Sequence, residues 1–315
     1  MPSSVVQTVS DPDDYASAIR ATKAEFTITG RGHFLAKLIR IDLHRLWMQR
    51  FFDNLPRVGH SAPGTGRATI SFRTAPGPSF LWSGVEMQPT GIMRHSEGKN
   101  SLQHSAGSAS WGAMSLSVED MVSVGAAMAG CDLTPPKDAL IVTPLPSAMA
   151  RLLRLHAAAG RLAEDAPEVI ANPDAARGLE QALIEALIDC LGVGEVHEDR
   201  SAQRRHSLVM RRFRRAVDED PDQLLYIPAL CAAIGVSERT MRVCCQEQLG
   251  MSPKRYLMMR RMNLARRALR DSSPERATVT ELATRYGFWQ FGRFAGEYKS
   301  LFGEAPSATL HRPRE

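Results

Sequence analysis

The sequence predicts an α+β protein with a β-rich N-terminal part and an all-α C-terminal part. Short mixed segments between turn residues run from about residue 20 to residue 115, and helical periodicity follows Pro135. Charge divides the chain as well. Residues 201–315 hold 21 Lys and Arg against 12 Asp and Glu, whereas the first 200 residues hold 18 against 22. A basic C-terminal third favours a polyanionic partner, and the alternative is a solvated basic face.

Length and composition exclude several classes of protein. A chain of 315 residues can form two domains with separate cores. No apolar run approaches the ~20 residues of a membrane span, and the first residues lack the basic and apolar regions of a secretory signal. The five cysteines have no CxxC spacing, so we expect buried thiols. These features predict a cytoplasmic protein with no membrane contact.

Residues 1–145 are expected to be β-rich, as a barrel or a sandwich. The segments EFTITG, HFLAKLIRI, ATISFR and SFLWSG have strand character and lie between turn clusters such as SAPGTG and TAPGPS. Ser117, with Asp120 three residues later, predicts the N-cap of a short helix.

The segment 146–193 is predicted to be helical. Apolar residues share one face of each of two helices, namely Met149, Leu152, Leu153, His156 and Ala159 on the first and Leu179, Leu183, Leu187 and Leu191 on the second. These faces either cap the β-rich part or pair with a second subunit as a dimerisation segment of a homodimer. The polar run 194–206 is predicted to be a linker to a last unit over 207–315.

The stretch 278–303 predicts a helix, a turn and a second helix. Thr278 and Glu281 form a capping box, Gly287 supplies the turn, and Gly303 ends the second helix, expected over 290–302. Four aromatics are expected to form one buried stripe along it: Phe291, Phe294, Tyr298 and Phe302. The opposite face has small residues and two cations, and consists of Gln290, Gly292, Arg293, Gly296, Glu297, Lys299 and Ser300. Such a face suits a helix that lies in the major groove of DNA.

The same pattern occurs about 52 residues earlier in the chain. Leu230 and Gly235 match Leu282 and Gly287, and Leu249 matches Phe302 after one extra residue in the second copy. Ser237 predicts the N-cap of a helix over 237–249, whose outward residues are Glu238, Arg239, Thr240, Arg242 and Val243. A long helix that starts at Ser252-Pro253 joins the copies, and two such helices on one DNA face should lie about one turn, ~34 Å, apart. The residues alone therefore predict a duplicated, basic helix-turn-helix unit.

This part of the chain closely resembles the DNA-binding domain of the AraC/XylS family of bacterial transcription regulators. The resemblance covers roughly residues 205–312 and rests on GVSERTMR, GMSPKRYLMMRRMNLARRAL, VTELATRYGF and FGEAPS. It implies two helix-turn-helix subdomains joined by a long helix, and an N-terminal effector or dimerisation domain, often a cupin-like barrel followed by helices. It also implies double-stranded DNA as a partner and activation more often than repression; we further expect RNA polymerase as a partner.

The resemblance implies roles for single residues by position. Arg239, Arg242 and Val243 fall where the first recognition helix of the family reaches bases, and Gly292, Arg293 and Gly296 fall at the equivalent places in the second. Ser237, Gln290 and Lys299 suit phosphate contact. Each Arg of the first helix could bind O6 and N7 of a guanine, and the alternative is a phosphate contact or a solvated side chain. The family often has larger polar residues at the two glycines, so Arg293 is expected to dominate the second helix.

The N-terminal part is expected to bind a small-molecule effector. Aromatic and methionine side chains could line its pocket, with plain barrel core as the alternative reading: Phe80, Trp82, Met87, Met93 and Trp111. Ligand binding would then shift the DNA-binding domain between two arrangements. His60, His95, Glu97 and His104 lack the close His-x-His pair of a cupin metal site, so we expect no metal and no cofactor. No phosphate loop or nucleophile elbow is present in the sequence, so we expect no enzyme.

Three alternatives stay open. The pair Cys244-Cys245 could sense oxidation, although a buried reduced pair that fills core space is the favoured interpretation. The chain could be a DNA-bending architectural protein with little sequence preference. It could also be a cupin-type oxygenase fused to a DNA-binding tail, which would need three metal ligands.

Overall fold

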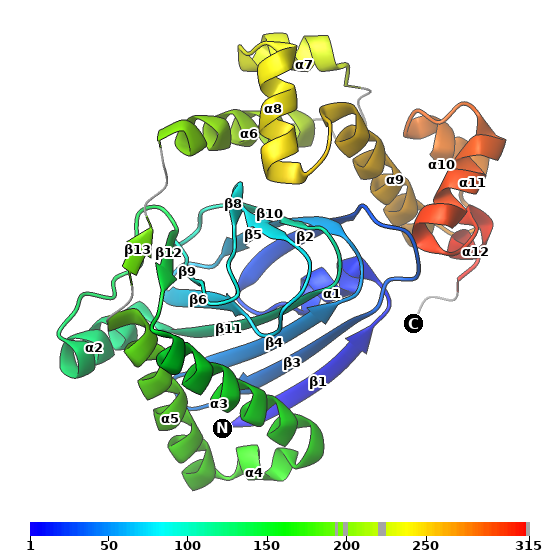
Figure 1. The fold of residues 1–315 in the computed structure, drawn as a ribbon. Coiled ribbons are helices and arrows are strands. Elements are labelled where there is room, and N and C mark those ends of the chain that lie inside the picture. Colours follow the sequence, from blue (N-terminus) through cyan, green and yellow to red (C-terminus); the bar gives the residue numbers. More distant parts are fainter. Residues whose placement is uncertain (193–194, 198–200, 220–224, 313–315) are drawn as a thin grey trace.

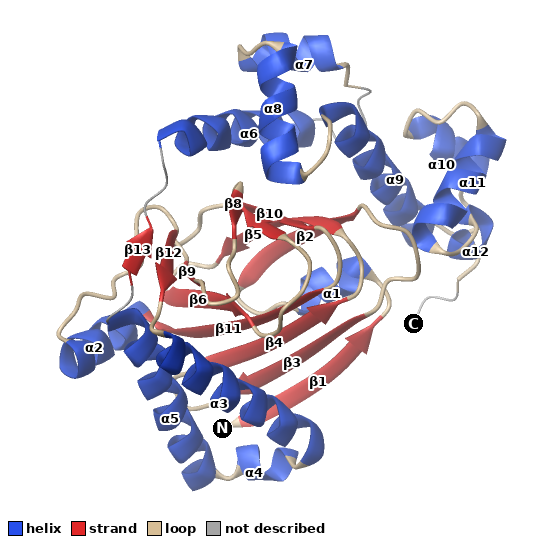
Figure 2. Ribbon diagram, in the orientation of Figure 1, coloured by secondary structure: helices blue, strands red, loops and turns tan. Residues whose placement is uncertain are grey.

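The computed structural model describes residues 1–192, 195–197, 201–219 and 225–312. A β-rich body occupies the centre of the molecule (Figure 1), with one group of helices against one side of it and the C-terminal helices along the other. Figure 2 shows the same division by secondary structure. The predicted α+β class, with a β-rich N-terminal part and an all-α C-terminal part, is confirmed.

The larger sheet has eight strands in the order β1-β3-β4-β11-β6-β9-β12-β13. Met114 on β11 lies opposite Met48 on β4 and Ile70 on β6, so one face of the sheet carries a row of buried apolar side chains. That row needs a cover, because apolar area is stable only when removed from water. The strands are β1 (Ser3–Val9), β3 (Ala36–Asp42), β4 (Trp47–Asp53), β6 (Arg67–Arg73), β9 (Ile92–Arg94), β11 (Ala109–Ser117), β12 (Leu140–Thr143) and β13 (Glu195–His197).

The smaller sheet has five strands in the order β2-β5-β10-β7-β8. They are β2 (Thr22–Ile28), β5 (Arg57–Pro63), β7 (Phe80–Trp82), β8 (Val85–Glu86) and β10 (Ser101–Ser105). A buried cluster joins the two sheets, since Trp82 of the small sheet and Trp111 of the large one belong to it. The described strands therefore form two facing open sheets and not the closed barrel that was one of the two expectations. β2 is an outer strand of the smaller sheet, and the backbone of its last residue, Ile28, pairs with the side chain of Asn263 and not with a strand of the other sheet.

Four helices cover the apolar row of the larger sheet: α2 (Val118–Ala129), α3 (Pro146–Asp165), α4 (Pro167–Ala171) and α5 (Pro173–Gly192). The Ser117 hydroxyl accepts a hydrogen bond from the Asp120 N–H at 3.0 Å, so the predicted N-cap of α2 is confirmed. Leu152 on α3 and Leu183 and Leu187 on α5 are fully buried against the sheet. The apolar faces of the two predicted helices thus cap the β-rich part.

The expected linker over 194–206 falls partly on residues 194 and 198–200, which lie outside the described residues. The rest of it holds β13, which pairs with β12, and the start of α6 (Ser201–Glu219). Residues 220–224 and 313–315 of the last expected unit also lie outside the described part.

The C-terminal helices pair into two similar units on either side of one long helix. They are α7 (Ile227–Ile234), α8 (Glu238–Leu249), α9 (Pro253–Asp271), α10 (Val279–Arg285), α11 (Phe291–Phe302) and α12 (Pro306–Leu310). The first unit has a core of its own with α6, in which Phe213 packs beside Tyr256. The second unit shares its core with the N-terminal part, because Tyr298 and Phe302 belong to the same cluster as Tyr15 of α1 (Pro12–Ala18). The all-α part is therefore docked on the β-rich part.

Candidate nucleic-acid interface and interdomain cavity

The two helix-turn-helix units share glycines at equivalent places, and each has one side-chain-capped helix, α8 in the first unit and α10 in the second. The Ser237 hydroxyl accepts a hydrogen bond from the Thr240 N–H at 3.1 Å and starts α8. In the second unit Thr278 and Glu281 exchange hydrogen bonds as the predicted capping box of α10. Four glycines with positive φ close the helices or make the turns: Gly235, Gly250, Gly287 and Gly303. Glycine adopts this backbone conformation without a steric penalty, and the predicted duplication is thus present in three dimensions.

The residues expected to contact DNA lie on the outer faces of α8 and α11. Ser237, Glu238, Arg239, Arg242 and Val243 are exposed on the first, and Thr240 is half-buried there. Gln290, Gly292, Arg293, Gly296 and Lys299 are exposed on the second. The two helices lie near opposite ends of α9 (Figure 1).

The cations of these two faces differ in their partners. Among the described residues, the side chains of Arg239, Arg242 and Lys299 have no hydrogen bond or ion pair. Arg293 donates from Nε to Glu297 Oε1 at 2.8 Å, one turn further along α11. Within the described residues three of the four cations are therefore unpaired, and the fourth is in an exposed pair that water screens.

The aromatic stripe of α11 is shorter than predicted. Phe294, Tyr298 and Phe302 are buried, but the side chain of Phe291 is 43% exposed, so its expected place in the core was wrong. The helix begins at Phe291, where the first turn extends past the edge of the core. Phe288, from the preceding turn, takes the expected place: its ring centroid lies 4.8 Å from that of Phe294.

The pair Cys244 and Cys245 is buried, as its favoured interpretation requires. Burial raises the pKa of Cys244 to about 11 and that of Cys245 to about 12. The Cys245 Sγ lies 3.8 Å from the Met210 Sδ and 3.9 Å from the Met241 Sδ. A protonated thiol among methionines fills core space and is a poor nucleophile.

The inner side of α9 carries a basic row that the sequence alone did not assign. Arg266 pairs with Asp11 at 2.8 Å, and Arg267 pairs with Asp13 at 2.8 Å and with Glu25 at 2.7 Å. These acids lie at the start of α1 and on β2. Part of the net positive charge of the C-terminal third is thus neutralised by acids of the N-terminal part, and these ion pairs hold the two parts together. The acidic run DPDD (11–14) was the feature of the sequence that could have indicated a partner for these arginines.

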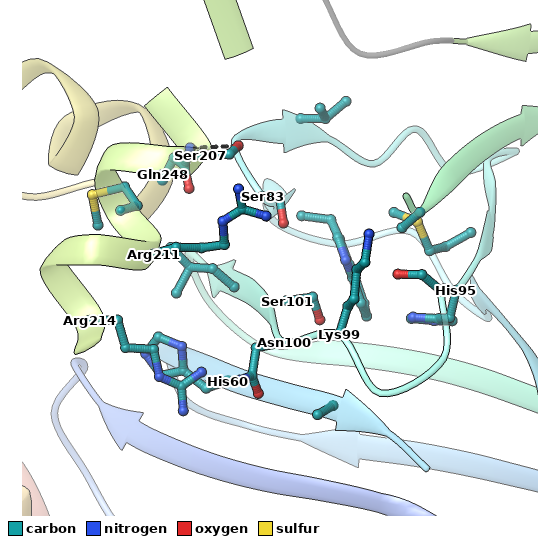
Figure 3. A pocket seen from close by; sticks show the side chains of 18 of the residues that line it. His60, Ser83, His95, Lys99, Asn100, Ser101, Ser207, Arg211, Arg214 and Gln248 are labelled. Atoms are coloured by element: carbon teal, nitrogen blue, oxygen red, sulfur yellow. Dashed lines mark hydrogen bonds between the residues drawn. The ribbon is translucent and has the colours of Figure 1, made fainter. Parts of the chain in front are cut away.

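A cavity of about 1470 Å³ lies between the β-rich part and helices α6, α8 and α9. Figure 3 shows side chains from both parts around it, with His60, His95 and Lys99 from the β-rich part and Arg211 and Arg214 from α6. The five side chains expected to line an effector pocket do come together in one buried cluster. Only Trp82 and Met93 of them reach the cavity; Phe80, Met87 and Trp111 are not part of its lining.

Known proteins resemble this chain mainly in its last third. Residues 230–312 match the model of a helix-turn-helix domain family. A probable thc operon regulatory protein of Rhodococcus erythropolis is 44% identical over 88 residues, which are 28% of this chain and 26% of that protein. The XylDLEGF operon transcriptional activator 3 of Pseudomonas putida is 34% identical over 96 residues, 30% of this chain and 29% of that protein. The C-terminal part is an AraC/XylS-type helix-turn-helix domain. The match spans less than a third of either relative's length.

Two solved structures are similar over most of their length at low identity. ToxT from Vibrio cholerae covers 98% of this chain and 97% of its own, at 12% identity and a TM-score of 0.30. An unsaturated fatty acid-bound ToxT covers 93% and 95%, at 9% identity and a TM-score of 0.29. Scores of this size do not establish a common fold. In the described part of the chain, no helix is long and apolar enough to cross a membrane.

Within the described residues, the cavity beside the AraC-type domain combines an apolar wall with two unpaired cations, Lys23 of β2 and Arg211 of α6. Trp82, Met93 and Phe213 contribute apolar surface. Arg214 is held by Asp218 at 3.0 Å, whereas Arg211 has no ion pair or hydrogen bond within the described residues. An apolar wall with a few polar groups is typical of small-molecule sites, and the free guanidinium favours an anionic group on the ligand.

Two histidines beside the cavity are neutral hydrogen-bonding groups. Burial lowers the pKa of His60 well below its ordinary value, and Arg214 and Arg260 add to this effect. Its Nε2 lies 3.2 Å from the Tyr256 hydroxyl of α9, and its Nδ1 has no partner in the described structure. Burial also lowers the pKa of His95 to about 4, and its Nε2 lies 2.9 Å from Ser71 Oγ. Across the described residues, no three His, Cys, Asp or Glu side chains converge as metal ligands.

Proposed function

We propose that this chain is a sequence-specific, DNA-binding transcription regulator, an activator that responds to a small-molecule effector. One observation carries the proposal. The helices α8 and α11, which occupy equivalent places in the two units and each end at a glycine, expose basic faces near the two ends of the long helix α9. Helices held in this way can enter two adjacent major-groove segments. In this proposal the protein is cytoplasmic, RNA polymerase is its partner on the promoter, and α3–α5 are available for a homodimer.

The role of each residue on the two faces follows from its chemistry. Arg239 and Arg242 bind guanine edges from α8, and Arg293 does so from α11. The Ser237 hydroxyl, Gln290 and Lys299 bind phosphates and set the position of the helices. The other residues of the two faces line the approach to the base edges: Glu238, Thr240, Val243, Gly292 and Gly296.

Gly292 and Gly296 support this assignment independently. A Cβ at either position would meet no atom within 4 Å, and neither residue has a positive φ. Nothing among the described residues therefore requires glycine at either position, although glycine in a helix interior, as at Gly296, costs about 1 kcal/mol relative to alanine. A partner whose backbone comes close to α11 would explain both residues.

The domain roles follow from the same proposal. Residues 1–145 form the effector-sensing part, 146–193 the helical segment, 194–206 the linker, and 207–315 the DNA-binding part. The effector is a small anionic molecule with an apolar body, bound in the cavity with its anionic group at Arg211. Because that cavity has walls from both parts, occupancy would change the relative stability of docked and undocked arrangements.

The DNA-binding proposal is tested by selecting sites from random duplex DNA with the full chain at fixed salt. We expect a split site with two segments about one helical turn apart. Arg239→Ala should relax one base position and cost about 1–3 kcal/mol at the selected site, whereas Lys299→Ala should weaken all sequences and lower the salt slope by about one. Arg154→Ala, an exposed cation on α3, is the control and should change neither quantity.

Two outcomes would contradict these assignments. If Arg239→Ala and Lys299→Ala weakened selected and random DNA alike, the separation of base and phosphate contacts would be wrong. Strong, salt-sensitive binding without any enriched site would favour an architectural protein that binds through phosphates alone.

The effector proposal is tested with the anionic apolar dye anilinonaphthalene sulfonate and the full chain. We expect dye binding to weaken about tenfold in Arg211→Gln, which removes its unpaired charge. Arg205→Gln lies on the same helix, is exposed and does not line the cavity, so it should bind the dye as the parent does. Equal affinity in both variants would exclude Arg211 as the anion-binding group.

A further inference from the structure

Two large aromatic side chains are exposed at the start of the second recognition helix. Trp289 is 67% exposed and Phe291 is 43% exposed, with only Gln290 between them. Neither ring has an aromatic or cation–π contact in the described structure, whereas the neighbouring Phe288 packs on Phe294 and lies under Arg261. Exposed aromatic groups that the protein's own core does not use are informative, because apolar surface of this size is normally covered.

The tandem duplication places Phe291 on the face proposed to meet DNA. Gln290 is the N-cap of α11 as Ser237 is the N-cap of α8, so Phe291 and Glu238 both occupy the first helical position. First-turn residues of a recognition helix are those that reach base edges in the major groove. Gly292 follows directly and leaves open space above the helix, which permits a close approach.

The chemistry of the groove identifies the occupant. Most major-groove base edges offer hydrogen-bond donors and acceptors, which a phenyl ring cannot satisfy. Thymine alone of the four bases presents a methyl group there, and phenylalanine is among the side chains that contact it. We propose that Phe291 reads the 5-methyl group of a thymine in the DNA segment bound by α11. This inference rests on the proposed DNA-binding function and adds a base identity to it.

The test removes the methyl group and changes nothing else. The full chain binds its selected duplex, and each thymine in the segment under α11 is replaced in turn by deoxyuridine. At one thymine we expect the parent Kd to rise about fourfold, the effect of one buried methyl group. Phe291→Ala should weaken binding to the thymine duplex by at least the same factor and lose all sensitivity to that deoxyuridine.

Two control variants test whether the deoxyuridine effect depends on Phe291 itself or on exposed aromatic side chains in general. Tyr226→Ala removes a 71% exposed aromatic outside both recognition helices and should keep the deoxyuridine effect. Trp289→Ala, which lies before the N-cap, should keep it as well. Because Phe291 is outside the core, its variant should unfold at the parent temperature, and this is measured alongside.

Each remaining outcome overturns the inference in a distinguishable way. Equal parent affinity for every deoxyuridine duplex shows that no methyl group is read, while the selected site still supports the DNA-binding proposal. A deoxyuridine effect that persists in Phe291→Ala assigns the methyl contact to another residue. If the variant binds all duplexes as the parent does but loses self-association in sedimentation, Phe291 contacts a second copy of the chain. Absence of any selected site would instead remove the proposed function itself.

Discussion

The side-chain amide of Asn263 on α9 pairs with both backbone groups of Ile28 on β2. The Ile28 N–H donates to Asn263 Oδ1 at 2.9 Å, and Asn263 Nδ2 donates to the Ile28 carbonyl at 3.0 Å. The side chain thereby takes the place of a further strand at the outer edge of the smaller sheet. The helix that joins the two helix-turn-helix units is held to the edge of the β-rich part by this contact. A shift of β2 would therefore act directly on α9.

Asn263→Ala should weaken this attachment. It leaves the Ile28 N–H and carbonyl unsatisfied at a buried edge, so we expect the free energy of unfolding to fall by about 1–3 kcal/mol. Hydrogen exchange at the Ile28 amide should accelerate more than at amides in the middle of the larger sheet. Gln246→Ala, an exposed amide side chain on α8, should change stability by less than about 0.5 kcal/mol. Unchanged protection at Ile28 would show that the contact does not hold the two parts together.

The ion pairs on the same helix as Asn263 predict that the contact between α9 and the N-terminal part is weakened at acidic pH. Burial raises the pKa of Asp11, but Arg266, the Asp13 N–H and Arg270 outweigh burial, so the pKa lies below its ordinary value of 3.8. The folded state thus binds this proton less tightly than the unfolded state, and the contribution of Asp11 is present above pH 3.8 and lost as the pH falls through the folded pKa.

Asp11→Asn should therefore destabilise the protein by about 3 kcal/mol at pH 7, because it leaves the buried Arg266 without its ion-pair partner. In urea titrations the difference from the parent should shrink only below about pH 4. Asp14→Asn is the matched control: its carboxylate also pairs with Arg270 but its side chain is 59% exposed, so a change below about 1 kcal/mol is expected. A constant difference down to pH 3 would mean that the pKa of Asp11 is the same in the folded and the unfolded protein.

His156 predicts a second and separate pH dependence, inside the β-rich part. Its Nδ1 accepts from Arg50 Nη1 at 3.2 Å and its Nε2–H donates to the Gln49 carbonyl at 3.2 Å. Burial, with Arg50, lowers its pKa from 6.5 to about 3. The unfolded state therefore binds more protons between these values, and stability falls as the pH falls below 6.5.

From pH 7 to pH 5 this one group should remove about 2 kcal/mol of stability. Glutamine can donate and accept as the neutral ring does but does not titrate. His156→Gln should thus lose about 2 kcal/mol less than the parent over that interval, whatever its stability at pH 7. His44→Gln, at an exposed position, should follow the parent. Parallel curves for His156→Gln and the parent would show that His156 is not kept neutral.

The parts of the structure that follow from local residues could be predicted from the sequence. The caps at Ser117, Ser237 and Thr278, the turn at Gly287 and the end at Gly303 depend on residues a few positions apart, and each is present. The duplication could be found because both units use the same spacing of core and turn residues. A strand at Ser3–Val9 was not anticipated, since its partner β3 lies about 30 residues away and its own burial pattern is irregular.

Features that depend on contacts between distant segments could not be predicted. Phe291 has the spacing of a core residue, and only the position of the neighbouring core leaves it outside. The arginines of α9 have the sequence of a DNA-binding surface, but Asp11 and Asp13, some 250 residues earlier, neutralise them. The cavity is lined by both parts of the chain, so no single stretch of sequence could reveal that Arg211 lines the same cavity as Trp82 and Met93.

The pair of Arg293 and Glu297 predicts how strongly α11 contributes to DNA binding. In the free protein the guanidinium is held at 2.8 Å by the carboxylate, which also repels phosphates. Glu297→Gln removes one negative charge from the proposed interface and releases Arg293, so we expect DNA affinity to rise about threefold to tenfold at low salt and less at high salt. Glu219→Gln is the matched control, because Arg215 and Glu219 form the same i, i+4 pair at 3.0 Å on α6. If both variants raised affinity equally, net charge alone would explain the effect and α11 would not lie against DNA. A gain confined to Glu297→Gln, abolished by Arg293→Ala in the same chain, would place this arginine at the interface.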